Sequence, residues 1–214
     1  MARASRAGGD AATAASAGRQ SARPLRADAR RNRDAVLVAA TAAFAAEGVG
    51  ASLEDIARRA GVGVGTLYRH FPTREALVLG VYEREVESLA ASADDLAATL
   101  EPAAALREWM RRFVRYAATK RGLVGMLRTM VQDDSELFDR AKSQIAAAAR
   151  KLLGAAVDAG QIRADVTAED LTRSMSGICV VSGRADEPDC AGRLIDIVYD
   201  GLRYGASAEP AAAR

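Results

Sequence analysis

Residues 52–71 read SLEDIARRAGVGVGTLYRHF, and this stretch decides the fold of the chain. Ser52 is a good N-cap residue, and Asp55 lies three positions later, where a capping box places an acidic side chain. Gly61 supplies the left-handed residue that ends this short helix, and the apolar side chain of Val62 follows it into the core. A small alanine, a turn glycine and an apolar plug in this order are typical of a helix-turn-helix.

A second short helix is expected over residues 63–70, with Leu67 and Phe71 facing inward at i, i+4 spacing. The first residues of such a helix enter the major groove of DNA. Glycines there permit close approach, Val64 suits a thymine methyl, and Thr66 suits a base edge or a phosphate. The candidate DNA-binding residues are Ser52, Gly63, Val64, Gly65, Thr66, Tyr68, Arg69, His70 and Arg74.

The flanking segments complete a small helical head. A first helix is expected over residues 31–47, ending at Gly48, a good C′ residue. Pro72 ends the second short helix, because the residue before a proline disfavours the α region. Thr73 then caps a long helix that runs to about Leu100 and links the head to the rest of the chain.

Two segments carry a family resemblance: VLVAATAAFAAEG at 36–48 and SLEDIARRAGVGVGTLYRHFPTREAL at 52–77. They resemble the DNA-binding domain of the TetR family of bacterial transcriptional regulators, over about residues 31–80. The tyrosine of GTLYRHF also suits packing at the domain edge, and the lone histidine suits an exposed structural position. The resemblance implies base-edge positions for Val64, Gly65 and Thr66, and phosphate or backbone contacts for Tyr68, His70, Ser52 and Arg74.

The sequence departs from the family pattern at Gly63 and Val64, where Ser or Thr followed by Lys or Arg is common. This departure removes a side-chain cap and one polar base contact from the start of the recognition helix. Sequence specificity should therefore depend more on Thr66, Arg69 and the shape of the DNA.

Charge is distributed unevenly along the chain. Residues 1–80 contain 12 arginines and 7 acidic residues, a net charge of +5, whereas residues 81–214 carry −3. A basic N-terminal region suits a polyanionic partner that binds at one end of the molecule. The alternative is a basic tail that is merely solvated. Residues 1–28 contain almost no large apolar side chain, and they are predicted to be a disordered basic arm that adds weak nonspecific attraction to DNA or reaches into a groove.

The rest of the chain shows apolar side chains at helical spacing, with no alternating strand pattern. We therefore predict an all-α protein with a three-helix helix-turn-helix domain at residues 29–76. A helical regulatory and dimerisation bundle follows at 77–205, with a flexible tail at 206–214. Pro102 suits the first position of a fifth helix, and Gly122 and Gly125 are expected to punctuate a shorter segment after it.

The last two helices are expected at about residues 168–181 and 188–204, and their apolar faces are broad for terminal helices. In the resembled family these helices pair with their mates in a four-helix dimer interface. The resemblance therefore implies a homodimer that presents two heads to a palindromic operator in double-stranded DNA.

Soft and aromatic side chains in the bundle suit a pocket for an unknown small-molecule effector of apolar or amphipathic character. The same residues at helical spacing also suit a plain core. The candidate ligand-binding residues are Trp109, Met110, Phe113, Met126, Met130, Phe138 and Met175, with Tyr116 beside them.

No catalytic motif, phosphate-binding loop or metal-ligand spacing occurs in the sequence, so we expect neither an enzyme nor a cofactor. Cys179 and Cys190 are too few for a disulfide scaffold, and Cys179 suits a buried thiol or an oxidation sensor. No apolar run reaches the length of a membrane span, and we expect a cytoplasmic protein without a membrane partner.

The sequence thus predicts a ligand-responsive, homodimeric repressor that binds a palindromic operator. The alternative is a helical interaction or scaffold protein whose head binds DNA only nonspecifically.

Overall fold

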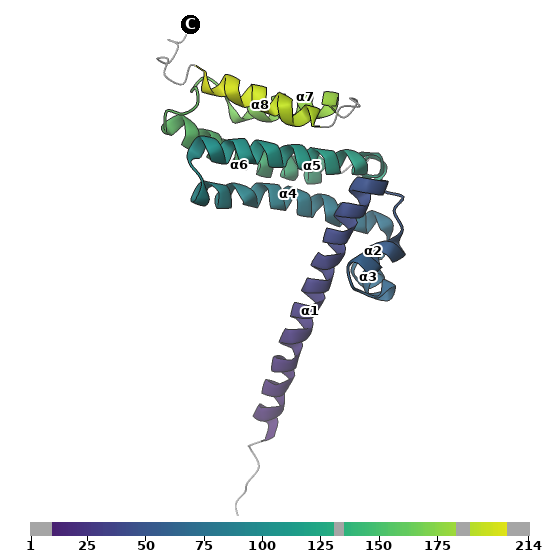
Figure 1. Cartoon of the computed structure of the whole chain (residues 1–214). Helices are drawn as coiled ribbons and strands as arrows, with labels where there is room; N and C mark the ends of the chain where they lie inside the picture. The colour runs from purple at the N-terminus through teal and green to yellow at the C-terminus, as the bar shows by residue number, and fades with distance from the viewer. Residues whose placement is uncertain (1–9, 131–134, 183–188, 205–214) are drawn as a thin grey trace, which may run out of the picture.

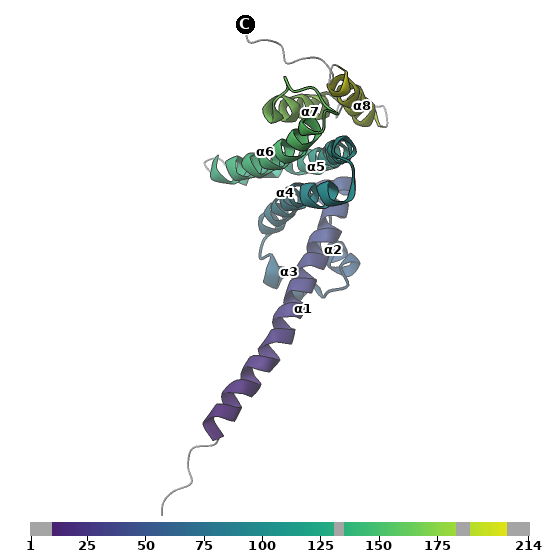
Figure 2. The same cartoon turned by 90° about the vertical axis from the view of Figure 1, so that its left-hand side faces the viewer.

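The computed structural model describes residues 10–130, 135–182 and 189–204, and these residues form helices without a strand (Figures 1 and 2). The predicted all-α class is confirmed. The helices are α1 (Asp10–Glu47), α2 (Leu53–Arg59), α3 (Val64–His70), α4 (Arg74–Thr99), α5 (Pro102–Met130), α6 (Ser135–Asp158), α7 (Ala168–Ser182) and α8 (Cys190–Arg203).

The helices are arranged in layers (Figure 1). The long helices α4, α5 and α6 pack against one another and form the centre of the body. Helices α7 and α8 cover the outer side of α5 and α6, whereas α2 and α3 lie at the opposite side, against the C-terminal part of α1. The small head and the α7/α8 layer are therefore separated by the central helices.

Helix α1 begins much earlier than expected. It starts at Asp10 rather than near residue 31, so the predicted disordered arm is wrong for residues 10–28. This part of the chain is rich in alanine and arginine, which have high helix propensity, and extending an existing helix adds one hydrogen bond per residue. Pro24 lacks an N–H and removes one of these bonds. The extension projects away from the body (Figures 1 and 2), and residues 1–9 lie outside the described part of the chain.

Helix α5 is also longer than expected, because neither Gly122 nor Gly125 interrupts it. Gly122 lies where the end of α1 crosses α5, and an added Cβ would stand 3.3 Å from the carbonyl oxygen of Phe44. The glycine therefore permits close helix contact rather than a turn. At Gly125, nothing lies within 4 Å of such a Cβ, and the continuous packing of α5 against α4 and α6 outweighs the local propensity.

Helix α4 connects the head to the body through a continuous buried face. Near its start, Gly80 lies so close to Phe71 that an added Cβ would stand 2.9 Å from the phenyl ring. Further along, the indole nitrogen of the fully buried Trp109 in α5 donates a hydrogen bond of 3.1 Å to the carbonyl oxygen of Leu89 in α4. One rigid element therefore contacts both the end of α3 and the core of the bundle.

A capping box precedes α7. The Thr167 hydroxyl accepts a hydrogen bond from the Asp170 amide, and the Asp170 carboxylate accepts one from the Thr167 amide, both at 3.1 Å. Helix α8 begins at Cys190 rather than near residue 188, which lies outside the described residues.

Helix α8 turns one apolar face toward the bundle and leaves another exposed. Helix α8 buries Ile195, Tyr199 and Leu202, whereas Ile197 is 65% exposed. The reason is that α8 meets the bundle on only one side, and its broad apolar surface extends beyond the area that α5 and α7 cover.

Candidate functional site

The turn between α2 and α3 has the geometry that the sequence predicts. The Ser52 hydroxyl accepts a hydrogen bond from the Asp55 amide and caps α2. At the other end, Gly61 has φ of +69°, the left-handed region that favours glycine. Its amide donates to the Arg58 carbonyl at 3.1 Å, and the Val62 amide donates to the Ala57 carbonyl at 3.0 Å. These two bonds form a Schellman motif, which fixes the direction in which α3 leaves α2.

Helix α3 is buried along one side and exposed to solvent on the other. Leu67 and Phe71 are buried in the head, as expected from their i, i+4 spacing. Val64 and Tyr68 are 41% and 43% exposed, large values for apolar and aromatic side chains. The candidate residues on this helix share the outer surface: Gly63, Val64, Gly65, Tyr68 and Arg69 are exposed, and Thr66 and His70 are half-buried.

The first turn of α3 has no side-chain cap, because Gly63 occupies the N-cap position. The amides at the start of the helix therefore face outward without a covering side chain. An added Cβ at Gly63 or Gly65 would have no atom within 4 Å, so this end of the helix is open to close approach by a partner.

Ser52 and Arg74 are placed differently from the other candidate residues. Besides capping α2, the Ser52 hydroxyl donates to the Glu54 carboxylate at 3.0 Å, so its single proton is engaged within the protein. The Arg74 guanidinium donates from Nη1 to the carbonyl oxygens of Val49 and Ala51, both at 2.6 Å.

These contacts give Arg74 a structural role, and the predicted clamp on the DNA backbone stays a prediction. Arg74 ties the start of α4 to the loop between α1 and α2, because its guanidinium donates hydrogen bonds to two backbone carbonyl oxygens of that loop. The side chain therefore holds the head together. The sequence could not show this contact, because the loop lies more than 20 positions away.

Arg33 is a head residue that was not among the candidates. Its guanidinium carbon lies 5.3 Å from the centroid of the Phe71 ring, a cation–π distance. Phe71 is the C-cap of α3, so this contact ties α1 to the end of the recognition helix. Arg33 carried no distinct signal in the sequence, because it lies within the polar run of residues 30–34.

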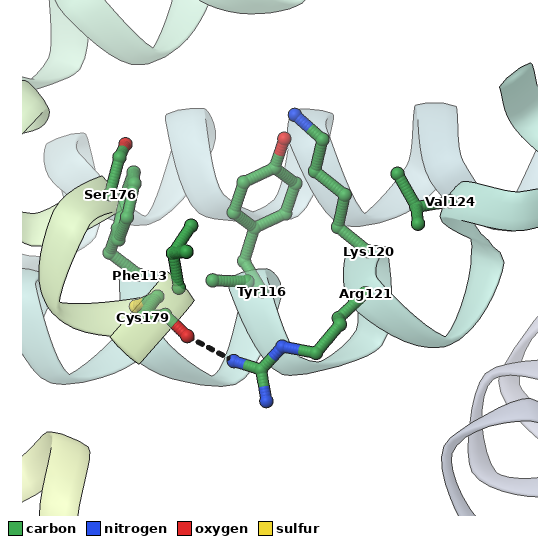
Figure 3. A pocket seen from close by; sticks show the side chains of 9 residues that line it. Phe113, Tyr116, Lys120, Arg121, Val124, Ser176 and Cys179 are labelled. Carbon is green, nitrogen blue, oxygen red and sulfur yellow. Dashed lines mark hydrogen bonds between the residues drawn. The ribbon is translucent and has the colours of Figure 1, made fainter. Parts of the chain in front are cut away.

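The body contains a cavity of about 280 Å³ between α5 and α7 (Figure 3). Of the candidate ligand-binding residues whose side chains are described, only Phe113 lines this cavity, together with Tyr116. The described lining residues are Phe113, Tyr116, Ala117, Lys120, Arg121, Val124, Ser176, Cys179 and Val180.

The other candidates have different positions. Trp109, Met110 and Met175 are fully buried core residues, because the faces of α5 and α7 that carry them meet other helices. Met126 packs against the core, Phe138 stacks edge-on against Tyr82, and the side chain of Met130 lies outside the described residues. In this structure Trp109, Met110 and Met175 belong to the core, the alternative that the sequence left open, and contact of these residues with a ligand stays a prediction.

The lining residues on α5 follow one stripe at positions 113, 116, 117, 120 and 124, which is helical spacing, and the last three of these were missed. The signal in the sequence was a lysine within this otherwise aromatic and apolar stripe. The residues from α7 carried no such signal, because their role depends on how α7 lies across α5.

The cavity combines apolar walls with groups of altered acidity. Burial raises the pKa of the Tyr116 hydroxyl above its ordinary value, and the Tyr82 hydroxyl beside it adds to this effect. Burial lowers the pKa of the Lys120 ammonium, and the nearby Lys142 lowers it further. The pKa of the Cys179 thiol is raised by burial, which favours the unreactive thiol over the thiolate.

Within residues 10–130, 135–182 and 189–204, no three His, Cys, Asp or Glu residues are grouped so that they could hold a metal ion. In the same part of the chain, no helix has both the length and the apolar character of a membrane span.

Comparisons with known proteins agree with this geometry. Residues 36–81 match the family model of bacterial regulatory proteins of the tetR family. Residues 101–204 match the C-terminal domain model described as transcriptional regulator SbtR-like.

Solved structures give the same result over most of the chain. A TetR transcriptional regulator from Streptomyces coelicolor is 46% identical, with a TM-score of 0.74, over 80% of this chain and 98% of that one. A TetR transcription regulatory protein from Mycobacterium vanbaalenii is 42% identical, with a TM-score of 0.69, over 84% of this chain and 99% of that one.

Proposed function

Because this chain belongs to the TetR family of bacterial transcriptional regulators, we propose that it is a ligand-responsive repressor that binds a palindromic operator as a homodimer in the cytoplasm. Members of the family are DNA-binding transcription factors and not enzymes. The observation that carries the proposal is the position of helix α3. Leu67 and Phe71 are buried in the head, and the opposite side of the helix is exposed to solvent.

The exposed side of α3 supplies the contacts that a recognition helix needs. Tyr68 and His70 near its end suit phosphate oxygens, and such contacts set the position of the helix on the duplex. Val64 and Thr66 suit base edges, and the bare glycines allow the backbone to approach the groove floor. Arg69 is exposed on the same helix and can reach either a base or a phosphate.

The dimer interface is proposed on the outer face of α7 and α8. Val180, Val181 and Ile197 are each about two-thirds exposed, and Tyr204 at the end of α8 is 80% exposed. Exposed apolar side chains gathered on adjacent helices are typical of a protein–protein interface. A twofold axis through this face would place the two α3 helices on one side of the dimer, as a palindromic operator requires.

The effector is proposed to bind in the cavity between α5 and α7. Helix α7 contributes Val180 both to the cavity lining and to the exposed outer face. A ligand that moved α7 would therefore alter the dimer interface and, through α4, the separation of the heads. A coupling free energy of about 1–3 kcal/mol would weaken operator binding roughly 5- to 150-fold.

A binding experiment tests the regulatory proposal. Fluorescence anisotropy would measure the affinity of the full chain for an inverted repeat from its own upstream region and for a scrambled duplex of equal length and composition, at several salt concentrations. We expect the inverted repeat to bind at least a hundredfold more tightly at moderate salt. Equal affinity for both duplexes would reject a specific regulator and favour the interaction protein with nonspecific DNA binding.

A further inference from the structure

We propose that the effector is an anionic amphiphile whose acidic group pairs with Lys120 while its apolar part fills the cavity between α5 and α7. This inference rests on the proposed effector site and adds the chemical class of the ligand. It begins with Lys120, which belongs to the cavity lining and whose ammonium points to the same side of α5 as the Tyr116 hydroxyl (Figure 3).

Three aromatic rings surround the Lys120 ammonium. Its nitrogen lies 5.9 Å from the ring centroids of Tyr82 and Phe138 and 6.0 Å from that of Tyr116. The ring faces stabilise the cation, but they replace only part of the hydration that is lost on burial. The lowered pKa of Lys120 reflects this incomplete compensation. An anion bound on the cavity side would supply the missing stabilisation of the Lys120 ammonium.

Among the described residues, the cavity lining provides no anion. These residues include two cations, Lys120 and Arg121, and no aspartate or glutamate. Among the described residues, no ion pair joins Lys120 to a carboxylate, and the nearby Asp139 of α6 pairs with Lys142 at 3.3 Å. The Arg121 guanidinium donates to the Cys179 carbonyl at 2.5 Å (Figure 3), which ties it to α7, whereas the Lys120 ammonium makes no such hydrogen bond in the part of the chain that the structure describes.

Most of the other side chains that line the cavity are apolar, and they favour a ligand with an apolar part. Phe113, Ala117 and Val124 on α5 face Cys179 and Val180 on α7 across the cavity. A charged group needs a paired partner in such surroundings, whereas a hydrocarbon chain gains free energy by leaving water. A cavity of about 280 Å³ is near the lower limit for small-molecule sites, which suits a chain of medium length.

Three probes with the same ten-carbon chain separate the charge requirement from apolar burial: decanoate, decan-1-ol and decyltrimethylammonium, each below its micelle concentration. Binding to the full-length dimer would be measured by calorimetry and by the fluorescence of Trp109, the single tryptophan, whose indole lies 6.0 Å from the Phe113 ring. The variants are Lys120→Met, which keeps the length without the charge, and Lys120→Arg, which keeps the charge. Lys142→Met is the matched control.

We expect decanoate to bind at least about tenfold more tightly than decan-1-ol, as a charge-assisted hydrogen bond would predict. Lys120→Met should remove this preference without weakening the alcohol, Lys120→Arg should restore most of it, and Lys142→Met should leave it unchanged. The inference is overturned if the alcohol or the quaternary cation binds as well as decanoate, if no probe binds, or if Lys120→Met retains the preference. It is equally overturned if Lys142→Met removes the preference.

Operator release, measured separately, distinguishes this inference from the proposed function. If decanoate binds through Lys120 and leaves operator affinity unchanged, the ligand class stands and ligand-responsive repression fails. If decanoate and decan-1-ol bind equally and both release the operator, ligand-responsive repression stands and the anionic class fails.

Discussion

Replacement of Gly65 by alanine should stabilise the protein and weaken its binding to DNA. In the free protein an added Cβ at this position meets no atom within 4 Å, and the residue has ordinary helical backbone angles. Alanine is favoured over glycine inside a helix by about 0.5–1 kcal/mol. Because Gly65 lies in the first turn of α3, we expect a gain of about 0.5 kcal/mol in the free energy of unfolding.

The effect on DNA binding should have the opposite sign. If the start of α3 lies against base edges, the new methyl group enters a closely packed contact. Inserting a methyl group into such a contact costs about 1–3 kcal/mol, and about 1.4 kcal/mol corresponds to a tenfold change in affinity. We therefore expect the operator affinity of the variant to fall by about tenfold or more.

Two measurements check this prediction. Urea denaturation gives the free energy of unfolding, and fluorescence anisotropy gives the affinity for a duplex selected from a random pool with the wild-type protein. The control is Gly61→Ala, which has equally open space around the Cβ but a φ of +69°. It should lose about 1 kcal/mol of stability and keep its affinity once folded. If Gly65→Ala binds DNA as tightly as the wild type, α3 does not present this face to the groove.

The other predictions address the remaining parts of the proposal. Tyr68→Phe should weaken binding to all duplexes about equally, and a change in base preference would contradict a phosphate contact. Thr66→Ala should relax the preference at one base position in a selection experiment, and an unchanged selected sequence would remove its base contact. Ile197→Glu should give monomers on size-exclusion chromatography, whereas the equally drastic Val38→Glu at an exposed site on α1 should leave a dimer; a dimeric Ile197→Glu would reject the α7/α8 interface. Arg74→Met should lower the free energy of unfolding by about 1–3 kcal/mol, and unchanged stability with a smaller salt dependence of DNA binding would instead restore its role as a phosphate clamp.

Local features were predictable from the sequence because their partners lie within a few residues. The Ser52 cap, the left-handed Gly61 and the inward Leu67 each depend on short-range backbone geometry, and all three occur as expected. The same holds for the Thr167 cap of α7. These local constraints allow few residue types at each of these positions. The head therefore resembles other members of the family in sequence.

The sequence by itself therefore determined the helical class, the helix-turn-helix and the bare start of its recognition helix. Only the tertiary structure decided that Arg74 ties a distant loop, that Gly122 permits a helix crossing, and that Lys120 rather than Trp109 reaches the cavity. The physical reason is the distance along the chain between interacting groups. Which side of α5 faces α4 and which faces α7 depends on the packing of the entire bundle, and the periodicity of one helix cannot specify it.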